Sequence, residues 1–97
     1  MLAPEAVEDL ENLKAKVRAE VRDAIEQYLR HQPTKVSKSR IKRLRGLSHP
    51  QYRLRIGDDI RVFYDVTKEI VLAVVAKSDA VEWLNKYGES DETSGSF

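Results

Sequence analysis

The stretch 52–66 alternates between apolar and polar side chains, and this alternation leaves few folds open to the chain. Successive side chains of a strand point to opposite faces of a sheet, so the pattern predicts strands with one buried face. Gly57-Asp58-Asp59 interrupts the pattern and predicts a turn, which makes the stretch a β-hairpin. One face is expected to carry Tyr52, Leu54, Ile56, Ile60, Val62, Tyr64 and Val66, and the other Arg53, Arg55, Arg61, Phe63 and Asp65.

The segment Ile70–Ala76 is apolar without interruption. A run of this kind is typical of a strand that is covered on both faces, which predicts a central place in the sheet. Thr67-Lys68-Glu69 supplies the turn that leads into it.

Apolar residues recur at steps of three and four between Pro4 and Leu29, which predicts helix in this region. The stretch 12–16 contains neither Gly nor Pro, so one long helix and a helical hairpin both remain open. Asp79 followed by Glu82 has the form of a capping box, and Gly88 is placed to end the short helix that would follow. The fold class predicted is therefore α+β.

The chain has 97 residues, which is the length of one domain. We expect a single domain over residues 1–88 and a disordered acidic, serine-rich tail over residues 89–97. The net charge of +1 conceals a block at 31–68 with ten Lys and Arg against three Asp and Glu. Local clustering of this kind indicates a polyanion or an acidic protein as the partner.

Several kinds of site have no support in the sequence. Cysteine is absent, and two isolated histidines do not make a zinc site, so no metal is expected. We find no glycine-rich phosphate loop and no nucleophile elbow, and we expect no cofactor. The longest apolar run is too short to cross a bilayer, so we expect no membrane association and a cytoplasmic location.

The segment 43–66 resembles the core of RelE/ParE family toxins of type II toxin–antitoxin systems. The resemblance lies in a Leu-Gly basic lead-in, the strand Tyr52-Arg-Leu-Arg55, a tight turn and then Arg61-Val-Phe-Tyr64. The opening 4–10 also looks like the first helix of the family, and 70–76 looks like its last strand. The resemblance implies a small twisted antiparallel sheet with an N-terminal helix or helical hairpin packed on one face, a short C-terminal helix, and a concave basic face opposite.

The resemblance also implies a function and partners. RelE-type members bind messenger RNA at the ribosome and promote its cleavage, whereas ParE-type members poison DNA gyrase; in both groups a cognate antitoxin protein neutralises the toxin. We expect an endoribonuclease, an mRNA interferase that inhibits translation. A ParE-like gyrase poison without nuclease activity, or an inactive relative that only binds antitoxin, are the alternatives.

Arg53, Arg55 and Arg61 match the basic positions that RelE-type toxins use around the scissile phosphate, and three guanidiniums on one sheet face suit a phosphate clamp. Phe63 on the same face is expected to stack a base. Lys77 follows the last strand and is taken as a catalytic residue, in place of a family Arg or His that this chain lacks. Further RNA-binding residues are expected at Lys38, Arg40, Lys42, Arg43 and Arg45.

The sequence also departs from the family at the first two arginine positions and at the N-terminus. Lysines often occupy the first two arginine positions in the nucleases, and arginine is a poor general base. His49 is the natural proton carrier near the basic block, but we interpret it as a loop residue, and we interpret Trp83 and Tyr87 as helix-packing residues. The family's first strand has almost no room before Pro4, which predicts three strands and turns Ile70–Ala76 into an exposed edge strand.

Overall fold

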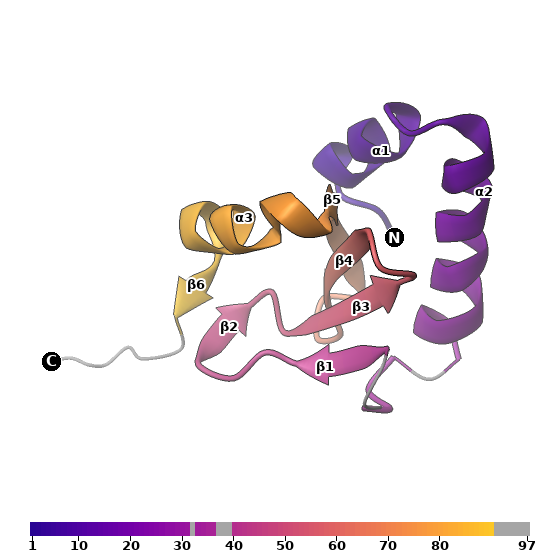
Figure 1. Ribbon diagram of the computed structural model, residues 1–97. Helices are drawn as coiled ribbons and strands as arrows, with labels where there is room; N and C mark the ends of the chain where they lie inside the picture. The colour runs from indigo at the N-terminus through magenta and orange to yellow at the C-terminus, as the bar shows by residue number, and fades with distance from the viewer. Residues whose placement is uncertain (32, 37–39, 91–97) are drawn as a thin grey trace, which may run out of the picture.

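The computed structural model describes residues 1–31, 33–36 and 40–90. It confirms an α+β fold with a small antiparallel sheet, N-terminal helices and a C-terminal helix (Figure 1). The helical elements are α1 (Pro4–Glu11), α2 (Ala15–Ala24), the π-helical turn η1 (Ile25–Leu29), the 3-10 turn η2 (Lys77–Asp79) and α3 (Ala80–Tyr87). The strands are β1 (Ile41–Arg43), β2 (Leu47–His49), β3 (Tyr52–Ile56), β4 (Ile60–Asp65), β5 (Ile70–Ala76) and β6 (Glu89–Ser90).

The main sheet has four strands in the order β1-β3-β4-β5, all antiparallel, so the predicted count of three is wrong. The additional strand is β1, in which Ile41 pairs with Leu54 and is buried. Three residues with one buried anchor are too short a pattern to predict a strand, and the surrounding lysines and arginines suggested a loop. The hairpin of β3 and β4 is confirmed, with Leu54 opposite Val62.

The strand β5 lies at the end of this order, so the expectation of a central position from its apolar run is wrong, and the edge position expected from the missing first strand is confirmed. Its apolar run has another cause, because α1 packs on one face of β5 and α3 contacts it as well. The backbone groups at the outer edge of β5 are also partly paired. Leu2 forms a parallel bridge with Val71, and two backbone bonds of 2.8 Å, from Ala3 N to Val71 O and from Val71 N to Met1 O, hold it. The N-terminal segment thus supplies a rudimentary strand.

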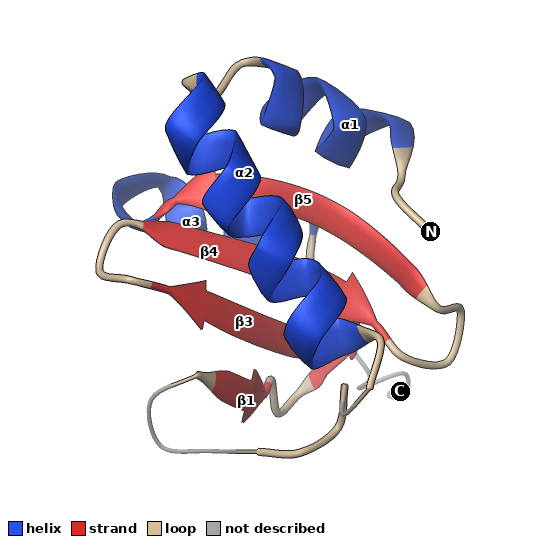
Figure 2. Ribbon diagram, turned by 90° about the vertical axis from the view of Figure 1, so that its right-hand side faces the viewer, coloured by secondary structure: helices blue, strands red, loops and turns tan. Residues whose placement is uncertain are grey.

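The hydrophobic core lies between one face of the sheet and the helices α1 and α2; α2 crosses that face, and α1 lies along β5 at its edge (Figure 2). Leu10, Val21, Leu54 and Val62 are fully buried in it. The helix α3 lies on the opposite side of the sheet, as Figure 1 shows. The face that the sequence assigned to arginines is therefore partly covered.

The N-terminal helices form a hairpin, which settles the alternative left open by the sequence. The helix α1 ends at Glu11 with Asn12 as its C-cap, and Lys14 is extended before α2 begins. The Arg18 guanidinium bonds the carbonyl oxygens of Leu10 at 2.9 Å and Leu13 at 2.8 Å. Carbonyls at a helix end lack partners within the helix, and here a side chain from the next helix provides them.

The C-terminal part differs from expectation in two respects. Asp79 makes no side-chain capping bond at the start of α3, so the predicted capping box does not form. Gly88 ends α3 as predicted, and a Cβ there would lie 2.6 Å from the Leu84 carbonyl oxygen. Glu89 and Ser90 pair with β2, so the expected disorder does not hold for these two residues. The remainder of the predicted tail, 91–97, lies outside the described residues.

We predict that Leu54→Ala lowers the free energy of unfolding by about 2–5 kcal/mol, because it removes a fully buried side chain from the centre of the core. Urea denaturation of the purified protein measures this change. Val81→Ala is the control, since Val81 is 71% exposed and its removal is expected to change stability by less than about 0.5 kcal/mol. A change at Leu54 as small as that at Val81 would show that the core is not organised around β3.

Candidate functional site

Three arginines share the face of the sheet that is turned toward α3. Arg55 lies opposite Arg61 in the register of β3 and β4, and Arg53 lies opposite Phe63. The prediction that Arg53, Arg55 and Arg61 share one face is therefore confirmed. We refer to these three residues as the arginine cluster.

The members of the cluster differ in how their guanidiniums are held. Arg55 bonds the Gly57 carbonyl oxygen at 3.0 Å and pairs with the exposed carboxylate of Asp58 at 2.7 Å. Arg61 is only 8% exposed and bonds the carbonyl oxygen of its neighbour Ile60. The turn that joins the two strands thus positions the Arg55 side chain, whereas Arg61 is held by the backbone of its own strand.

Arg53 is the least compensated member. Its Nε is buried and has no hydrogen-bond partner among the described residues. Burial, followed by repulsion from Arg61 and Arg55, lowers the pKa of the Arg53 guanidinium from its usual value. A desolvated cation beside two like charges is unfavourable unless an anion binds there, so the cluster has the electrostatics of an anion site.

Phe63 is not available to a nucleobase, so the predicted base-stacking role is wrong. It is 1% exposed, and the Trp83 ring of α3 stacks on it with centroids 4.9 Å apart and an angle of 7° between planes. Tyr87 tilts against Trp83 at 5.4 Å. The helix-packing interpretation of Trp83 and Tyr87 agrees with these contacts.

The other basic residues that were predicted to bind RNA are spread over several surroundings. Lys42 and Arg45 are exposed, and Lys42 lies opposite Arg53 in the register of β1 and β3. Arg40 lies over the Tyr28 ring at 4.9 Å. Arg43 bonds the Gln51 carbonyl oxygen at 2.7 Å, which gives it a structural contact. Lys38 lies outside the described residues.

Lys77 lies at the same end of the sheet as Arg55 and Arg61. It is exposed, it follows β5 directly, and its backbone N–H bonds the Asp59 carbonyl oxygen of the β3–β4 turn at 2.6 Å. This contact holds the backbone of Lys77 at the β3–β4 turn, next to the end of the strands that carries Arg55 and Arg61.

His49 is paired with a buried carboxylate, which the sequence did not reveal. Its Nδ1 forms a short contact with Oδ2 of Asp65, and Asp65 is 3% exposed. Oδ1 of the same carboxylate accepts the backbone N–H of Gln51 at 2.9 Å. Since His49 also belongs to β2, its interpretation as a loop residue is wrong. The two residues are sixteen positions apart, and neither carries a local signal of the pairing.

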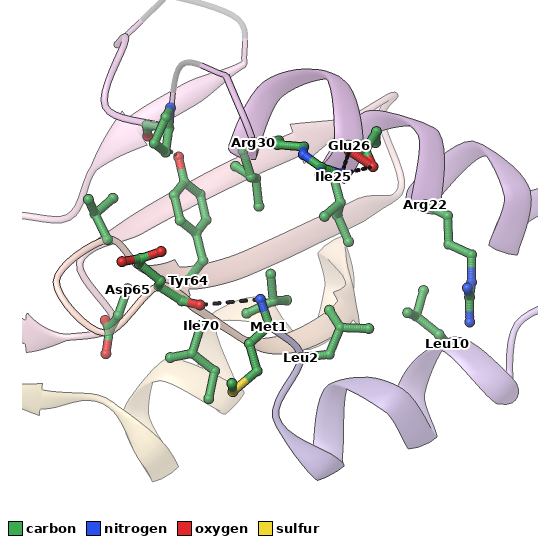
Figure 3. Close-up of a pocket in the computed structure, with 15 residues that line it drawn as sticks. Met1, Leu2, Leu10, Arg22, Ile25, Glu26, Arg30, Tyr64, Asp65 and Ile70 are labelled. Atoms are coloured by element: carbon green, nitrogen blue, oxygen red, sulfur yellow. Dashed lines mark hydrogen bonds and ion pairs between the residues drawn. The ribbon is translucent and has the colours of Figure 1, made fainter.

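A groove of about 700 Å³ opens on the helix side of the sheet (Figure 3). Aliphatic residues of the N-terminus, of α2 and η1 and of β5 line most of it, including Leu2, Ile25, Leu29 and Ile70. Charged groups lie at its border, where Arg30 pairs with Glu26 and the Met1 ammonium bonds the Glu69 carbonyl oxygen at 3.3 Å. The groove is separate from the arginine cluster, which occupies the other face.

Within residues 1–31, 33–36 and 40–90, His, Asp and Glu side chains form no group that could hold a metal ion. The helices in this part of the chain are too short or too polar to span a bilayer.

Comparisons with known proteins identify the fold and the family. The fold matches the crystal structure of a RelB–RelE antitoxin–toxin complex from Methanococcus jannaschii with a TM-score of 0.64 and 22% sequence identity, over 86% of this chain and 96% of that chain. Among curated proteins, none matches the sequence. Residues 1–80 match the family described as the ParE toxin of the type II toxin–antitoxin system parDE. The chain therefore belongs to the RelE/ParE family and is the toxin of a type II toxin–antitoxin module.

Proposed function

We propose that this toxin is a ribosome-dependent endoribonuclease that holds the scissile phosphate of messenger RNA on its arginine cluster. The observation that carries the proposal is the uncompensated Arg53, with its unpaired Nε, beside Arg55 and Arg61 on one sheet face. Planar guanidiniums bind phosphate through paired hydrogen bonds, and a phosphate would offset the repulsion among the three cations.

The cluster suits the electrostatic part of RNA cleavage. Attack of a ribose 2′-hydroxyl on the adjacent phosphate adds negative charge to the phosphate oxygens, and preorganised cations stabilise that charge. Lys77 at the end of the cluster contributes in the same way. Phe63 cannot hold the nucleobase next to the bound phosphate, because Trp83 covers its ring. Another group must therefore hold that nucleobase. The ribosome is the candidate for that task.

A gyrase poison is the second candidate, and the match to the ParE toxin family favours it. A protein of this kind needs a basic docking surface but no group that transfers protons. Induced expression separates the two: a nuclease stops translation and leaves cut transcripts, whereas a gyrase poison causes DNA damage and filamentation. An inactive relative that only binds antitoxin would do neither.

We predict that Arg53→Ala, Arg55→Ala and Arg61→Ala each weaken growth arrest and transcript cleavage. A hydrogen bond to a charged group contributes about 1.5–3 kcal/mol, which corresponds to a loss of about 10- to 150-fold in rate for each variant. Mapping of transcript ends after induction measures the effect. Arg22→Ala is the matched control, because Arg22 is exposed on α2 and lies on the other side of the sheet. Full activity in all three cluster variants would contradict the phosphate clamp.

We predict that Arg53→Met separates stability from function. The substitution replaces the arginine with an apolar side chain of similar length, and it removes a cation that burial and two like charges disfavour. The free energy of unfolding should therefore stay the same or rise. Cleavage should fall as in Arg53→Ala. Arg55→Met is the comparison, since it loses the contact with Asp58 and should not gain stability. Urea denaturation at low salt gives both values; a fall in stability at Arg53 alone would show that the fold needs this cation.

We predict that a cognate antitoxin inhibits through an acidic segment rich in leucine, which covers the basic surface between Lys38 and Arg61. The association rate should then fall steeply between low and physiological salt, because the screening length shrinks from about 30 Å at 0.01 M to about 8 Å at 0.15 M. Stopped-flow binding measures the rate, and the double variant Lys42→Gln, Arg45→Gln should flatten its salt dependence, since both side chains are exposed. An association rate that is independent of salt would rule out electrostatic steering.

A further inference from the structure

The pair formed by His49 and Asp65 takes no part in the phosphate grip described above, yet it lies on the same face of the sheet. We infer that His49 is the proton-accepting residue of the cleavage site, held for this role by Asp65. The inference rests on the proposed endoribonuclease function and adds to it the group that the arginines themselves do not supply.

The geometry of the pair fixes which nitrogen can react. The buried carboxylate of Asp65 faces Nδ1, so Nδ1 carries the hydrogen that it donates, and the neutral ring keeps its lone pair on Nε2. The backbone N–H of Gln51 fixes the other carboxylate oxygen at 2.9 Å, which prevents the carboxylate from turning away. The His49 side chain is 26% exposed, so the ring is not sealed off from solvent.

The pair also lies within one nucleotide's reach of the arginine cluster. Arg61, Phe63 and Asp65 follow each other on one face of β4, and a rise of about 3.4 Å per residue places Asp65 about 7 Å along the strand from Phe63. Arg53 lies beside Phe63 in the register. Figure 1 shows β2, which carries His49, on the same side of the sheet as α3. Along β3 and the residue before it, Arg55, Arg53 and Gln51 alternate on this face, and the backbone N–H of Gln51 bonds Asp65. A phosphate on Arg53 would therefore have Arg55 on one side along β3 and the His49–Asp65 pair on the other, without crossing Phe63, which Trp83 covers.

Two neighbouring strands bring charged groups to His49. Asp65 belongs to β4, and Glu89 of β6 lies opposite His49 in the β2–β6 register. Arg43 of β1 bonds the carbonyl oxygen of Gln51 and so holds the backbone that fixes Asp65. The whole arrangement depends on the pairing of β2 with β6, which places the ring over the end of β4.

The chemical step then balances as follows. The ribose 2′-oxygen forms a bond to phosphorus and passes its proton to Nε2 of His49, while the bond from phosphorus to the 5′-oxygen breaks. A water molecule protonates the departing 5′-oxygen, and the imidazolium returns its proton to the hydroxide that remains. The products are a 2′,3′-cyclic phosphate and a 5′-hydroxyl, and the toxin is unchanged.

Cleavage of a defined mRNA in a purified translation system tests the assignment. His49→Gln keeps a hydrogen-bond donor for Asp65 but cannot accept the proton, and it should slow cleavage about 10²- to 10⁴-fold while the toxin still binds ribosomes. His49→Ala should be equally slow and should regain part of its rate when free imidazole is added. His31→Ala is the control, since His31 is exposed and belongs to the chain before β1; it should cut at the rate of the unmodified toxin.

The outcomes separate this inference from the function on which it rests. Cleavage by His49→Gln at the unmodified rate, with Arg53→Ala inactive, would show that the His49–Asp65 pair has only a structural role. The proposed endoribonuclease function would not be affected by that result. Intact RNA with the unmodified toxin would overturn both. Should the His49 variants fail to fold, the ring tautomer of the unmodified toxin decides by ¹⁵N NMR: hydrogen on Nδ1 in the neutral ring supports the assignment, and hydrogen on Nε2 refutes it.

Discussion

The register between β3 and β4 is the constraint on which the rest of the structure depends. With Leu54 opposite Val62, every second side chain of both strands enters the core beneath α1 and α2. The same register places Arg55 opposite Arg61 on the other face. A slip of one residue would exchange the two faces, exposing the core residues and burying the arginines. One pairing therefore determines both the stability of the fold and the assembly of its cationic site.

The arginine face is not an open surface, because α3 lies on part of it. Trp83 stacks on Phe63 and so forms a small second core on this side of the sheet. Arg53 lies beside Phe63, which accounts for its partial burial and for the unpaired Nε. Water is removed from the guanidinium by hydrophobic packing, and interactions with an anion are stronger where water is excluded. The packing of α3 on Phe63 thus lies beside Arg53, the cation whose pKa is lowered by burial.

The sequence predicted those parts of the fold that follow a local period. The strands β3 and β4 were predicted because fifteen residues alternate around one turn, and the same alternation placed the three arginines together. The strand β1 was not predicted, since Ile41 alone marks its buried face. The edge position of β5 was ambiguous, because a helix on each face of an edge strand yields the same apolar run as a central strand.

The parts of the site that the sequence did not predict depend on contacts between distant residues. Alternation assigns Phe63 to a face but does not say what covers that face, so the stacking by Trp83 was missed. Asp65 was also assigned to the correct face, but its partner His49 belongs to a different strand, β2. The three residues of β2 form a strand because Glu89 and Ser90 pair with them. Such contacts carry no periodic signal in the sequence.

The turn between α1 and α2 is shaped by a side chain from outside the turn. Arg18 holds the end of α1 through the carbonyls of Leu10 and Leu13, which belong to the backbone and are present whatever side chains the turn carries. The exposed residues Asn12 and Lys14 are therefore free to drift during evolution, whereas the position of Arg18 is not. Among distant descendants of this chain, we expect the sequence of the turn to vary while the arginine one helical turn later is retained. The position of that arginine would then identify the helical hairpin in sequences whose turn residues no longer do so.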